Sequence, residues 1–498
     1  MTSTLSFNSH RMLFLNTLAF TVCFAVWMFN GVLVTFLVDN QIYSWSPVEI
    51  GWLMAIPPLS GSIFRLHAGV WTDRFGGKIT FSILLFLCAV PMYLLSFANG
   101  FWHFVICSFG FGLIGQGFSI GIAYTSVWYP KNWQGRALGI FGVGNVGAAV
   151  TTLFAPTILN NLTHNGAMLD EWRKLPQIYA VALIGMGVLF LIFSINKKSD
   201  AAKGKTFVQM LQPLKQLRVW RFGLYYYLVF GCFVALAQWL VPYFLNLYSI
   251  SLVAAGIMAS IFSIPAGLIR ALGGWLSDKY GARTIMYWVL GSSIVFCMLL
   301  IIPQLEINTP GQGIMAKRKG TVTFVSDSLI TIDQKNYPLI KKGSDESEGS
   351  FHIFPVKNIW QAPMVKIGDE VKKKQLIAKG ITHIFFEANI WLAVFFIFVI
   401  GFMWGIGKAA VYKHIPEYFP NDVGAVGGMV GLLGGLGGFV SPIIFGYLLE
   451  WTGMWTSMWI FLFIISVICM WWMHTVISRM RDEAAPTTKE KFERMGGR

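Results

Sequence analysis

Two arginines lie inside long apolar segments of the sequence, where a charge is costly. Arg65 and Arg270 each precede a short polar connector by about two helical turns. Placing a guanidinium near the centre of a bilayer costs about 2.5–3.5 kcal/mol even on a lenient insertion scale. A single arginine near a helix end can extend its charge to the surface, but matching positions favour one shared cavity. Because no Asp or Glu falls well inside any apolar segment, we predict that a small anionic substrate balances the two charges.

Two glycine-rich stretches, Gly135 to Gly147 and Gly424 to Gly438, each open an apolar segment. Small residues three and four apart let helices approach closely, so packing explains most of these glycines. Asn145 is different, because an amide on an apolar face needs a partner, and chemistry alone leaves backbone and ligand equally open. The glycines that we expect along the substrate path are Gly139, Gly142, Gly144, Gly147, Gly428, Gly431, Gly434 and Gly435.

The same residues occur twice at constant spacings. Arg65 and the loop after it recur 205 positions later, and Gly135, Gly139 and Gly142 recur 289 positions later as Gly424, Gly428 and Gly431. The two loops carry Gly69, Asp73 and Gly76, and in the second copy Gly274, Asp278 and Gly281. We expect the glycines to allow a tight turn and the carboxylates to pair with cations at the seam between two halves. Parallel duplicated halves are typical of secondary transporters, and the sequence lacks the Gly-x-x-x-x-Gly-Lys-Ser/Thr motif of an ATP-driven pump.

The elements that must position these residues are membrane-spanning helices. Of the 498 residues, 55% are hydrophobic and only 12% are charged, which excludes a soluble enzyme, a nucleic-acid-binding protein and a disordered chain. We therefore predict an all-α polytopic membrane protein with twelve transmembrane helices in two six-helix halves. The apolar segments are expected near residues 12–38, 50–72, 79–98, 101–129, 137–159, 175–196, 222–249, 251–276, 284–304, 389–412, 423–449 and 451–478.

Charge in the connectors predicts the orientation of the chain. Lysines and arginines gather in alternate short connectors, which places both termini in the cytoplasm of a multi-pass protein of the cytoplasmic membrane. Much of the net charge of +15 lies in these connectors, so it indicates topology and no nucleic acid partner. The predicted parts are an N-terminal half at 1–200, a cytoplasmic linker at 201–221, a C-terminal half at 222–304 and 389–478, and a cytoplasmic tail at 479–498.

Residues 305–388 interrupt the second half between the ninth and tenth segments, and this orientation places them outside the cytoplasm. Alternating stretches at 320–325 and 329–333 predict short strands. Val365 to Gly380 is similar to the repeat unit of barrel-sandwich, lipoyl-like β modules, although Lys374 stands where those modules usually have Gly and no Met-Lys-Met tip is present. We expect a small β insert without a covalent cofactor. The six cysteines lack metal-ligand spacing, so we expect no metal or other cofactor.

These motifs resemble those of a known family. Gly69 to Lys78 and Gly273 to Arg283 resemble the loop signature of the major facilitator superfamily. Gly135 to Gly147 and Gly424 to Gly438 resemble the paired nitrate signatures of its nitrate/nitrite porter family. The resemblance covers both six-helix halves and omits the insert.

The resemblance also implies roles for single residues. In the family, two arginines clamp the planar anion, an Asn of the first signature helps to hold it, and an aromatic residue of the seventh helix contributes. These roles fall on Arg65, Arg270, Asn145 and Tyr226. Tyr225 and Tyr227 adjoin Tyr226, so the register of the aromatic residue stays open. His67 stands where the family has Pro soon after the first arginine, which affects local helix shape.

The implied function is alternating-access transport of nitrate, with nitrite as a second substrate, by a protein that is not an enzyme. The lack of acidic residues within the segments favours exchange of one anion for another. Gly405 to Pro416, which contains Lys408, and Gly121 to Thr125 resemble instead the proton-coupled uptake branch of the family. We predict nitrate/proton symport with Lys408 as the candidate coupling residue, or a lysine that extends to the cytoplasmic surface. The alternatives are a nitrate/nitrite antiporter, a carrier of another small anion such as formate, and a non-transporting sensor or scaffold.

Overall fold

A computed structural model describes residues 7–198, 212–301, 304–341, 356–387, 390–419 and 423–484. The chain forms two compact units: a helical unit from the segments up to Met298 and from Phe396 onward, and a second unit from Leu299 to Phe395. Residues 201–211 of the predicted linker and 485–498 of the predicted tail lie outside the described residues. The rest of both predicted segments is partly helical, because one helix begins at Leu217 and another continues to Ala484.

The first half of the helical unit consists of helices that are often built from two consecutive pieces. Several of them change from α-helix to a short 3-10 turn and back without leaving the same run. The elements are α1 (Phe7–Trp27), α2 (Phe29–Asp39), α3 (Pro47–Ile63), α4 (Arg65–Phe75), α5 (Gly77–Leu94), η1 (Leu95–Phe97), α6 (Phe101–Gly112), η2 (Leu113–Gln116), α7 (Gly117–Ser126), α8 (Lys131–Gly142), η3 (Val143–Val146), α9 (Gly147–Leu162), η4 (Leu169–Arg173) and α10 (Lys174–Phe193).

The second half repeats this construction and ends with three long helices. A six-residue π-helix interrupts its first run. The elements are η6 (Gln212–Lys215), α12 (Leu217–Tyr226), η7 (Tyr227–Cys232), α13 (Phe233–Leu247), α14 (Leu252–Leu268), α15 (Arg270–Tyr280), α16 (Ala282–Leu300), α17 (Ile390–Tyr418), α18 (Val423–Thr452) and α19 (Ser457–Ala484).

Ten helical runs in the described part of the chain are long and apolar enough to cross a membrane, and the bent pair α14–α15 makes an eleventh. The protein is therefore a multi-pass membrane protein. The predicted segment at 50–72 falls on α3 and α4, which are helical but fall outside this set. The break at Phe64 leaves α3 with 17 residues, and Arg65, Asp73 and Arg74 make α4 polar. The predicted count of twelve spans stays a prediction.

The sequence repeat is also a repeat of structure. Helices α3 and α14 both have 17 residues, and Ser46 and Ser251, which are 205 positions apart, cap their N-termini through the side-chain oxygen. Each helix is followed by an 11-residue helix that ends at a glycine in the left-handed region, Gly76 at φ 90° and Gly281 at φ 84°. A side chain would be strained at both turns, so these two loop glycines have the predicted conformational role.

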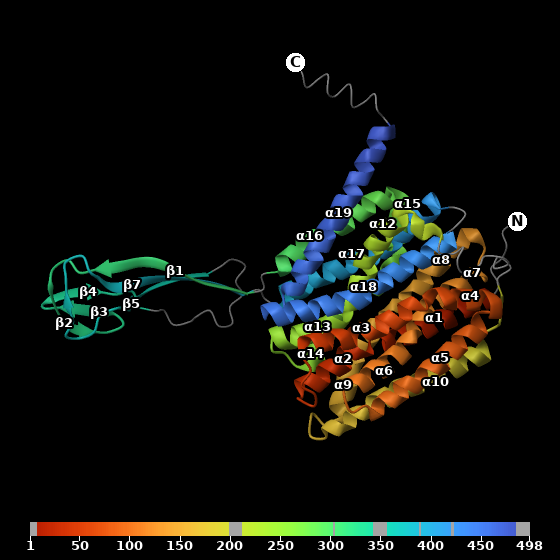
Figure 1. The fold of residues 1–498 in the computed structure, drawn as a ribbon, viewed down its shortest axis with the longest axis horizontal. Helices are drawn as coiled ribbons and strands as arrows, with labels where there is room; N and C mark the ends of the chain where they lie inside the picture. Colours follow the sequence, from red (N-terminus) through yellow and green to blue (C-terminus); the bar gives the residue numbers. More distant parts are fainter. Residues whose placement is uncertain are drawn as a thin grey trace, which may run out of the picture. The chain divides into compact units, whose positions relative to one another are not determined.

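The two halves pack against each other through symmetrically related helices. Helix α3 lies along α18, α9 lies along α14, and α8 contacts α15. In Figure 1 the helices of the first half, drawn red to yellow, and those of the second half, drawn green to blue, form two groups within the helical unit. The duplicated residues therefore meet along the seam between the halves.

The second unit consists of two antiparallel sheets. One sheet has the order β1 (Gln304–Met315), β7 (Leu376–Glu387) and β5 (Val356–Pro363). The other has the order β4 (Lys335–Pro338), β3 (Leu329–Ile332), β2 (Gly320–Val325) and β6 (Glu370–Val371). The unit has its own core, which includes Val322, Ile330, Val371 and Ile377. Lys374 has φ 67°, so it adopts the left-handed conformation that a glycine usually takes at this position of the repeat.

Removing most of the second unit should leave the helical unit folded, because the core of the second unit is built from residues of that unit. Pro310 pairs with Ile381 across β1 and β7, so an Asn-Gly turn in place of residues 311–380 closes a two-residue hairpin. We expect the deletion variant to elute as a sharp peak from size exclusion in detergent and to unfold within a few degrees of the full chain. If the deletion variant aggregates while wild-type protein prepared in the same way stays dispersed, the helical unit does not fold independently of the second unit.

Candidate anion-binding site

Arg65 lies at the start of α4, buried at 1% exposure. It directly follows Phe64, where a ψ of 1° interrupts the helix between α3 and α4. The interruption therefore lies next to the residue that carries the guanidinium. The side chain reaches across the seam: Nη1 donates to the carbonyl oxygen of Gly431 at 2.8 Å, and Nη2 donates to that of Gly115 at 3.4 Å. Nε has no hydrogen-bond partner among the described residues. Two of the five N–H groups of the guanidinium are therefore in use within the described part of the chain, and the Nε–H group is among those that remain.

Arg270 occupies the equivalent place in the second half. It begins α15 after the break at Ile269, where ψ is −3°, and it is 8% exposed. Its guanidinium carbon lies 5.5 Å from the ring centroid of Phe118, and that of Arg65 lies 5.3 Å from the same ring. Nη1 of Arg270 also lacks a hydrogen-bond partner in the described part of the chain. The structure thus brings both predicted arginines to one aromatic ring, each with a free donor.

Each arginine contacts a signature glycine of the opposite half. A Cβ on Gly142 in α8 would lie 2.8 Å from Cδ of Arg270. A Cβ on Gly431 in α18 would lie 3.8 Å from Nη1 of Arg65 and 3.0 Å from the hydroxyl of Tyr412. These glycines are 289 positions apart and the arginines 205, so the two contacts are related by the internal repeat. The glycines give the arginines room to cross the seam.

Irregular helical segments supply the polar backbone of the site. Gly115, which accepts from Arg65, belongs to the 3-10 turn η2, and Asn145 belongs to the 3-10 turn η3. The π-helix η7 begins directly after Tyr226 and contains Phe230. Such departures from α-geometry are frequent at functional sites because they free or redirect backbone groups.

Tyr226 is fully buried next to a second tyrosine that the sequence did not single out. Its ring stacks on Phe230 with centroids 5.0 Å apart and meets the ring of Tyr412 edge-on at 5.0 Å. The guanidinium carbon of Arg270 lies 5.7 Å from the centroid of the Tyr412 ring. The Tyr226 hydroxyl lacks a hydrogen bond among the described residues, whereas that of Tyr412 donates to the Gly427 carbonyl at 3.1 Å.

Asn145 is fully buried, and neither its amide nitrogen nor its oxygen has a hydrogen-bond partner in the described residues. It follows Gly144, which packs on Phe20, one of the residues around Arg65. An unpaired amide is costly in an apolar interior. Of the two partners that the sequence left open, a ligand is the one that this arrangement favours.

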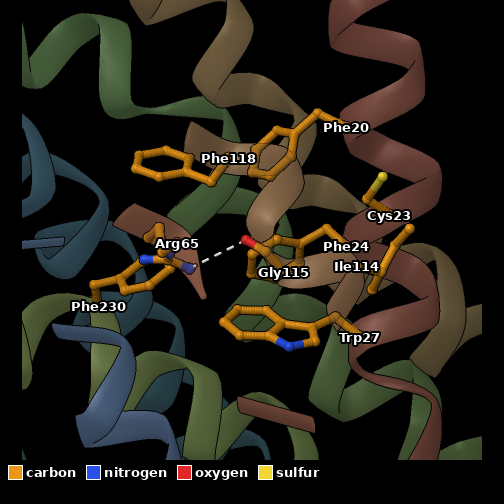
Figure 2. Close-up of a pocket in the computed structure, with 9 residues that line it drawn as sticks. All are labelled: Phe20, Cys23, Phe24, Trp27, Arg65, Ile114, Gly115, Phe118 and Phe230. Carbon is orange, nitrogen blue, oxygen red and sulfur yellow. Dashed lines mark hydrogen bonds between the residues drawn. The ribbon is translucent and has the colours of Figure 1, made fainter. Parts of the chain in front are cut away.

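A narrow pocket, lined mainly by aromatic side chains, lies beside Arg65. Figure 2 shows the guanidinium with Phe118 on one side and Trp27 on the other, and its contact to the Gly115 carbonyl as a dashed line. Its centre lies 5.8 Å from the Trp27 ring and 5.7 Å from the Phe230 ring. Aromatic faces stabilise the cation without neutralising it, so the site stays attractive to an anion. Sequence inspection missed these rings because aromatic residues are abundant throughout the chain.

Lys408 is a third buried cation close to this site. It is 0% exposed, so it does not extend to the surface as the alternative interpretation required. Its Nζ donates to the Ala266 carbonyl at 3.3 Å and lies 3.2 Å from the ring centroid of Phe233. Within the described residues, the buried lysine and arginine side chains are Arg65, Arg221, Arg270 and Lys408, and no Asp or Glu is buried. The interior therefore carries an uncompensated positive charge.

The loop residues divide into two kinds. Gly69 and Gly274 lie within α4 and α15, where an added Cβ would meet open space, so they are not the turn glycines that we expected. The turns fall at Gly76 and Gly281, as described above. Asp278 pairs with Lys413 at 2.5 Å, both partly exposed and both in the second half. Asp73, in α4, is partly buried.

The remaining predicted glycines mostly serve close packing. Gly147 packs against the backbone of α1, Gly434 against the ring of Tyr226, and Gly435 against Ser62, where an added Cβ would also lie 3.5 Å from Nη1 of Arg65. Gly139 has room, since the nearest atom to its Cβ would be 3.8 Å away. Gly428 lies in α18. Of the eight, Gly142, Gly431 and Gly435 approach an arginine of the site.

Comparison with protein families places this architecture. The model of the Major Facilitator Superfamily matches residues 15–315 and 376–495. Two crystal structures share the fold. One is a bacterial homolog of the human lysosomal transporter Spinster, with a TM-score of 0.61 and 12% sequence identity, and the match covers 94% of this chain and 96% of that one. The other is the nucleoside transporter NupG, with a TM-score of 0.57 and 11% sequence identity, and the match covers 94% of this chain and 99% of that one.

Curated relatives are more similar in sequence. A probable nitrate/nitrite antiporter of Thermus thermophilus, NarK1, is 36% identical over 492 residues, which cover 98% of this chain and 96% of the relative. A nitrite extrusion protein of Bacillus subtilis is 28% identical over 313 residues, 62% of this chain and 76% of the relative. A probable nitrate transporter of Staphylococcus carnosus, NarT, is 24% identical over 454 residues, 91% and 92%.

The contact between Gly142 and Arg270 can be tested with two alanine substitutions on one helix. Gly142→Ala places a methyl group 2.8 Å from Cδ of Arg270, so the arginine must move. We expect the binding of a planar oxyanion, probed by titration of the purified protein with nitrate, to weaken about tenfold or more, since overpacking costs ~1–3 kcal/mol. Gly139→Ala, one turn earlier with its nearest neighbour at 3.8 Å, should bind as the wild type does. Equal effects of the two substitutions would refute the specific contact.

Proposed function

The chain belongs to the major facilitator superfamily and, within it, to the nitrate/nitrite porter family, and from that premise we propose that it carries nitrate, with nitrite as a second substrate, across the cytoplasmic membrane by alternating access. The observation that carries this proposal is the pair of buried arginines that share Phe118 and lack a buried carboxylate among the described residues. The superfamily consists of transporters, which are not enzymes.

The geometry of the donors suits a flat oxyanion. A guanidinium is planar and presents N–H groups in a fixed fork, which matches the planar oxygens of nitrate or the bent nitrite. Nε of Arg65 and Nη1 of Arg270 are without partners in the described chain, and the amide of Asn145 and the hydroxyl of Tyr226 add unpaired polar groups. We propose that the anion accepts hydrogen bonds from both arginines, with Asn145 and Tyr226 completing the site.

Binding between the halves would couple the anion to closure. Because Arg65 belongs to the first half and Arg270 to the second, an anion held by both reduces their mutual repulsion and favours the state in which the halves are close. When the halves rock apart, the Arg65 contact to Gly431 of the opposite half has to break. Rocking of parallel halves around a central site is the general mechanism of such transporters.

Replacing either arginine by lysine tests the clamp. Lysine keeps the charge but loses the planar fork, and each lost charge-assisted hydrogen bond is worth ~1.5–3 kcal/mol. We expect Arg65→Lys and Arg270→Lys each to reduce nitrate uptake into proteoliposomes by about tenfold or more, with normal yield and elution of the protein. Arg318→Lys, at an exposed position in the second unit, is the matched control and should transport at the wild-type rate. Near wild-type uptake by either buried variant would eliminate the clamp.

For coupling we propose nitrate/proton symport through Lys408. A buried ammonium without a carboxylate partner is unfavourable, and an anion nearby compensates its charge. Entry of nitrate would therefore favour the protonated lysine, and release of nitrate would favour loss of the proton. The Nζ of Lys408 lies 5.9 Å from the centroid of the Phe230 ring, which borders the pocket beside Arg65, and this proximity supports the link.

Nitrate/nitrite exchange is the second candidate. Two observations favour it: no acidic residue is buried in the described part of the chain, and the Thermus relative carries the name of a probable nitrate/nitrite antiporter. In exchange, a second anion would replace the first between the arginines before the halves reorient, and Lys408 would act only as fixed positive charge.

Two substitutions on α17 separate these mechanisms. In proteoliposomes without nitrite, an inward proton gradient should drive nitrate accumulation by the wild type. Lys408→Ala should lose most of this drive because it removes the buried ionisable group, while Lys413→Ala, at a half-exposed position paired with Asp278, should retain it. Uptake that requires internal nitrite and ignores the gradient would establish exchange and exclude symport.

A further inference from the structure

A second, narrow cavity lies between α12, α16, α17 and α19 of the second half. Its residues are not among those of the anion site at Arg65. It lies at the end of the helical unit where the α15–α16 turn carries Lys279 and Arg283, which the distribution of charge places on the cytoplasmic side. The transport proposal does not use this cavity.

One wall of the cavity is strongly cationic. Arg221 is 8% exposed, and Arg283 donates a hydrogen bond to the hydroxyl of Tyr418. The guanidinium of Arg218 also lies over the Tyr418 ring, 5.1 Å from its centroid, and that of Arg283 lies at 5.9 Å. Three guanidinium groups thus gather around this wall, and none of the lining residues is acidic.

Two buried polar groups in the same wall are unpaired. The hydroxyl of Tyr225, which is 2% exposed, has no hydrogen-bond partner among the described residues. His414 is 4% exposed and stacks on Phe222, and its Nδ1 also lacks a hydrogen bond there. The nearest carboxylate, that of Glu417, lies 3.8 Å from Nδ1 and is itself half-exposed. Buried donors beside unneutralised guanidiniums indicate a place for an oxygen-rich anion.

The opposite wall is apolar. It consists of four side chains of α19, namely Met473, Val476, Ile477 and Met480. A small hydrated anion would gain nothing from this wall, whereas an acyl chain or glycerol backbone would be stabilised by it. A ligand that contacts both walls must be an amphiphile with an anionic head.

We propose that this cavity binds the phosphate group of an acidic membrane phospholipid, with Arg221 and Arg283 on the phosphate and the lipid chain along α19. Guanidinium groups bind phosphate through paired hydrogen bonds. Basic pockets between transmembrane helices at the cytoplasmic side are a known mode of lipid headgroup recognition. The required chemistry is a phosphate ester, and attachment to a lipid distinguishes it from free phosphate.

Such a lipid would act on the helices that build the transport site. Arg221 lies on α12, which ends at Tyr226, and His414 and Tyr418 lie on α17 beyond Tyr412. Since Tyr226 and Tyr412 contact each other in the anion site, a lipid that bridges the ends of α12 and α17 stabilises the packing of both tyrosines. This inference holds whatever ion the protein transports.

The test measures thermal unfolding of the full-length protein in detergent with added phosphatidylglycerol, phosphatidylcholine or inorganic phosphate. We expect phosphatidylglycerol to raise Tm by a few degrees in a concentration-dependent manner, as a ligand of the folded state does, and the other two to leave it unchanged. Arg221→Gln should shift the concentration needed for half of this effect about tenfold upward. Arg479→Gln, an exposed arginine next to the apolar wall, should respond as the wild type does.

A second variant covers the case in which Arg221→Gln does not fold. Val476→Glu places a carboxylate opposite the arginines, where it neutralises them and repels a phosphate, so the protein should stay folded and lose the response to phosphatidylglycerol. If inorganic phosphate alone raised Tm, the cavity would bind a soluble anion and the proposed lipid ligand would be wrong. Equal stabilisation by phosphatidylcholine, or an unchanged response in both variants, would overturn the proposal.

Discussion

The helical unit is organised around positive charge that no buried carboxylate neutralises in its described residues. Arg65, Arg270 and Lys408 are at most 8% exposed, and burial of a lone ion costs several kcal/mol even after relaxation. The structure lowers this cost in two ways that keep the charge intact. Backbone carbonyls accept from Arg65 and Lys408, and aromatic rings lie over all three cations. A carboxylate would stabilise the folded protein more, but it would also compete with an anionic ligand. The site is therefore stable enough to persist when empty, and in the proposed function a bound anion stabilises it further.

This arrangement explains why the helices are irregular where they are. In a regular α-helix each interior carbonyl already accepts a backbone N–H, so a buried guanidinium needs either a freed carbonyl or close approach to one that it can share. The 3-10 turn at Gly115 provides one, and the glycines of α18 bring the backbone of Gly431 close enough to provide another. The breaks before Arg65 and Arg270 occur at equivalent positions in both halves. The irregularities therefore recur with the repeat, which indicates that they belong to the site and are not incidental defects of packing.

The sequence alone predicted the chemistry of the site better than its packing. The spacings of 205 and 289 residues identified the arginines and the glycines, because each exact recurrence is improbable by chance in a long chain. The same spacings did not reveal that Arg65 meets Gly431 and Arg270 meets Gly142. Those contacts depend on how each helix is rotated, and helices that are apolar on every side have no periodicity from which rotation can be read.

For the same reason Phe118 and Tyr412 were missed, and the loop glycines Gly69 and Gly274 were expected at turns although they lie inside helices. The helix breaks at Phe64 and Ile269 could not be predicted either, since Phe and Ile commonly occur inside helices and do not mark a break.

The crossed contacts also bear on how the halves can move. Each arginine reaches the glycine helix of the opposite half, so the two contacts lie on both sides of the internal symmetry axis. Separation of the halves at one end must stretch at least one of them, and the loss of a charge-assisted hydrogen bond is worth ~1.5–3 kcal/mol. An anion that bridges the arginines adds to the cost of separation, and its departure removes that part. In the proposed alternating-access cycle, these polar contacts at the seam contribute to the cost of separating the halves, within the range that ligand binding can shift. The two halves are parallel repeats of the kind related by an axis along the membrane normal, so the repeat places one arginine on each side of the seam, and within the described residues the Arg65 contact is the one made by a hydrogen bond.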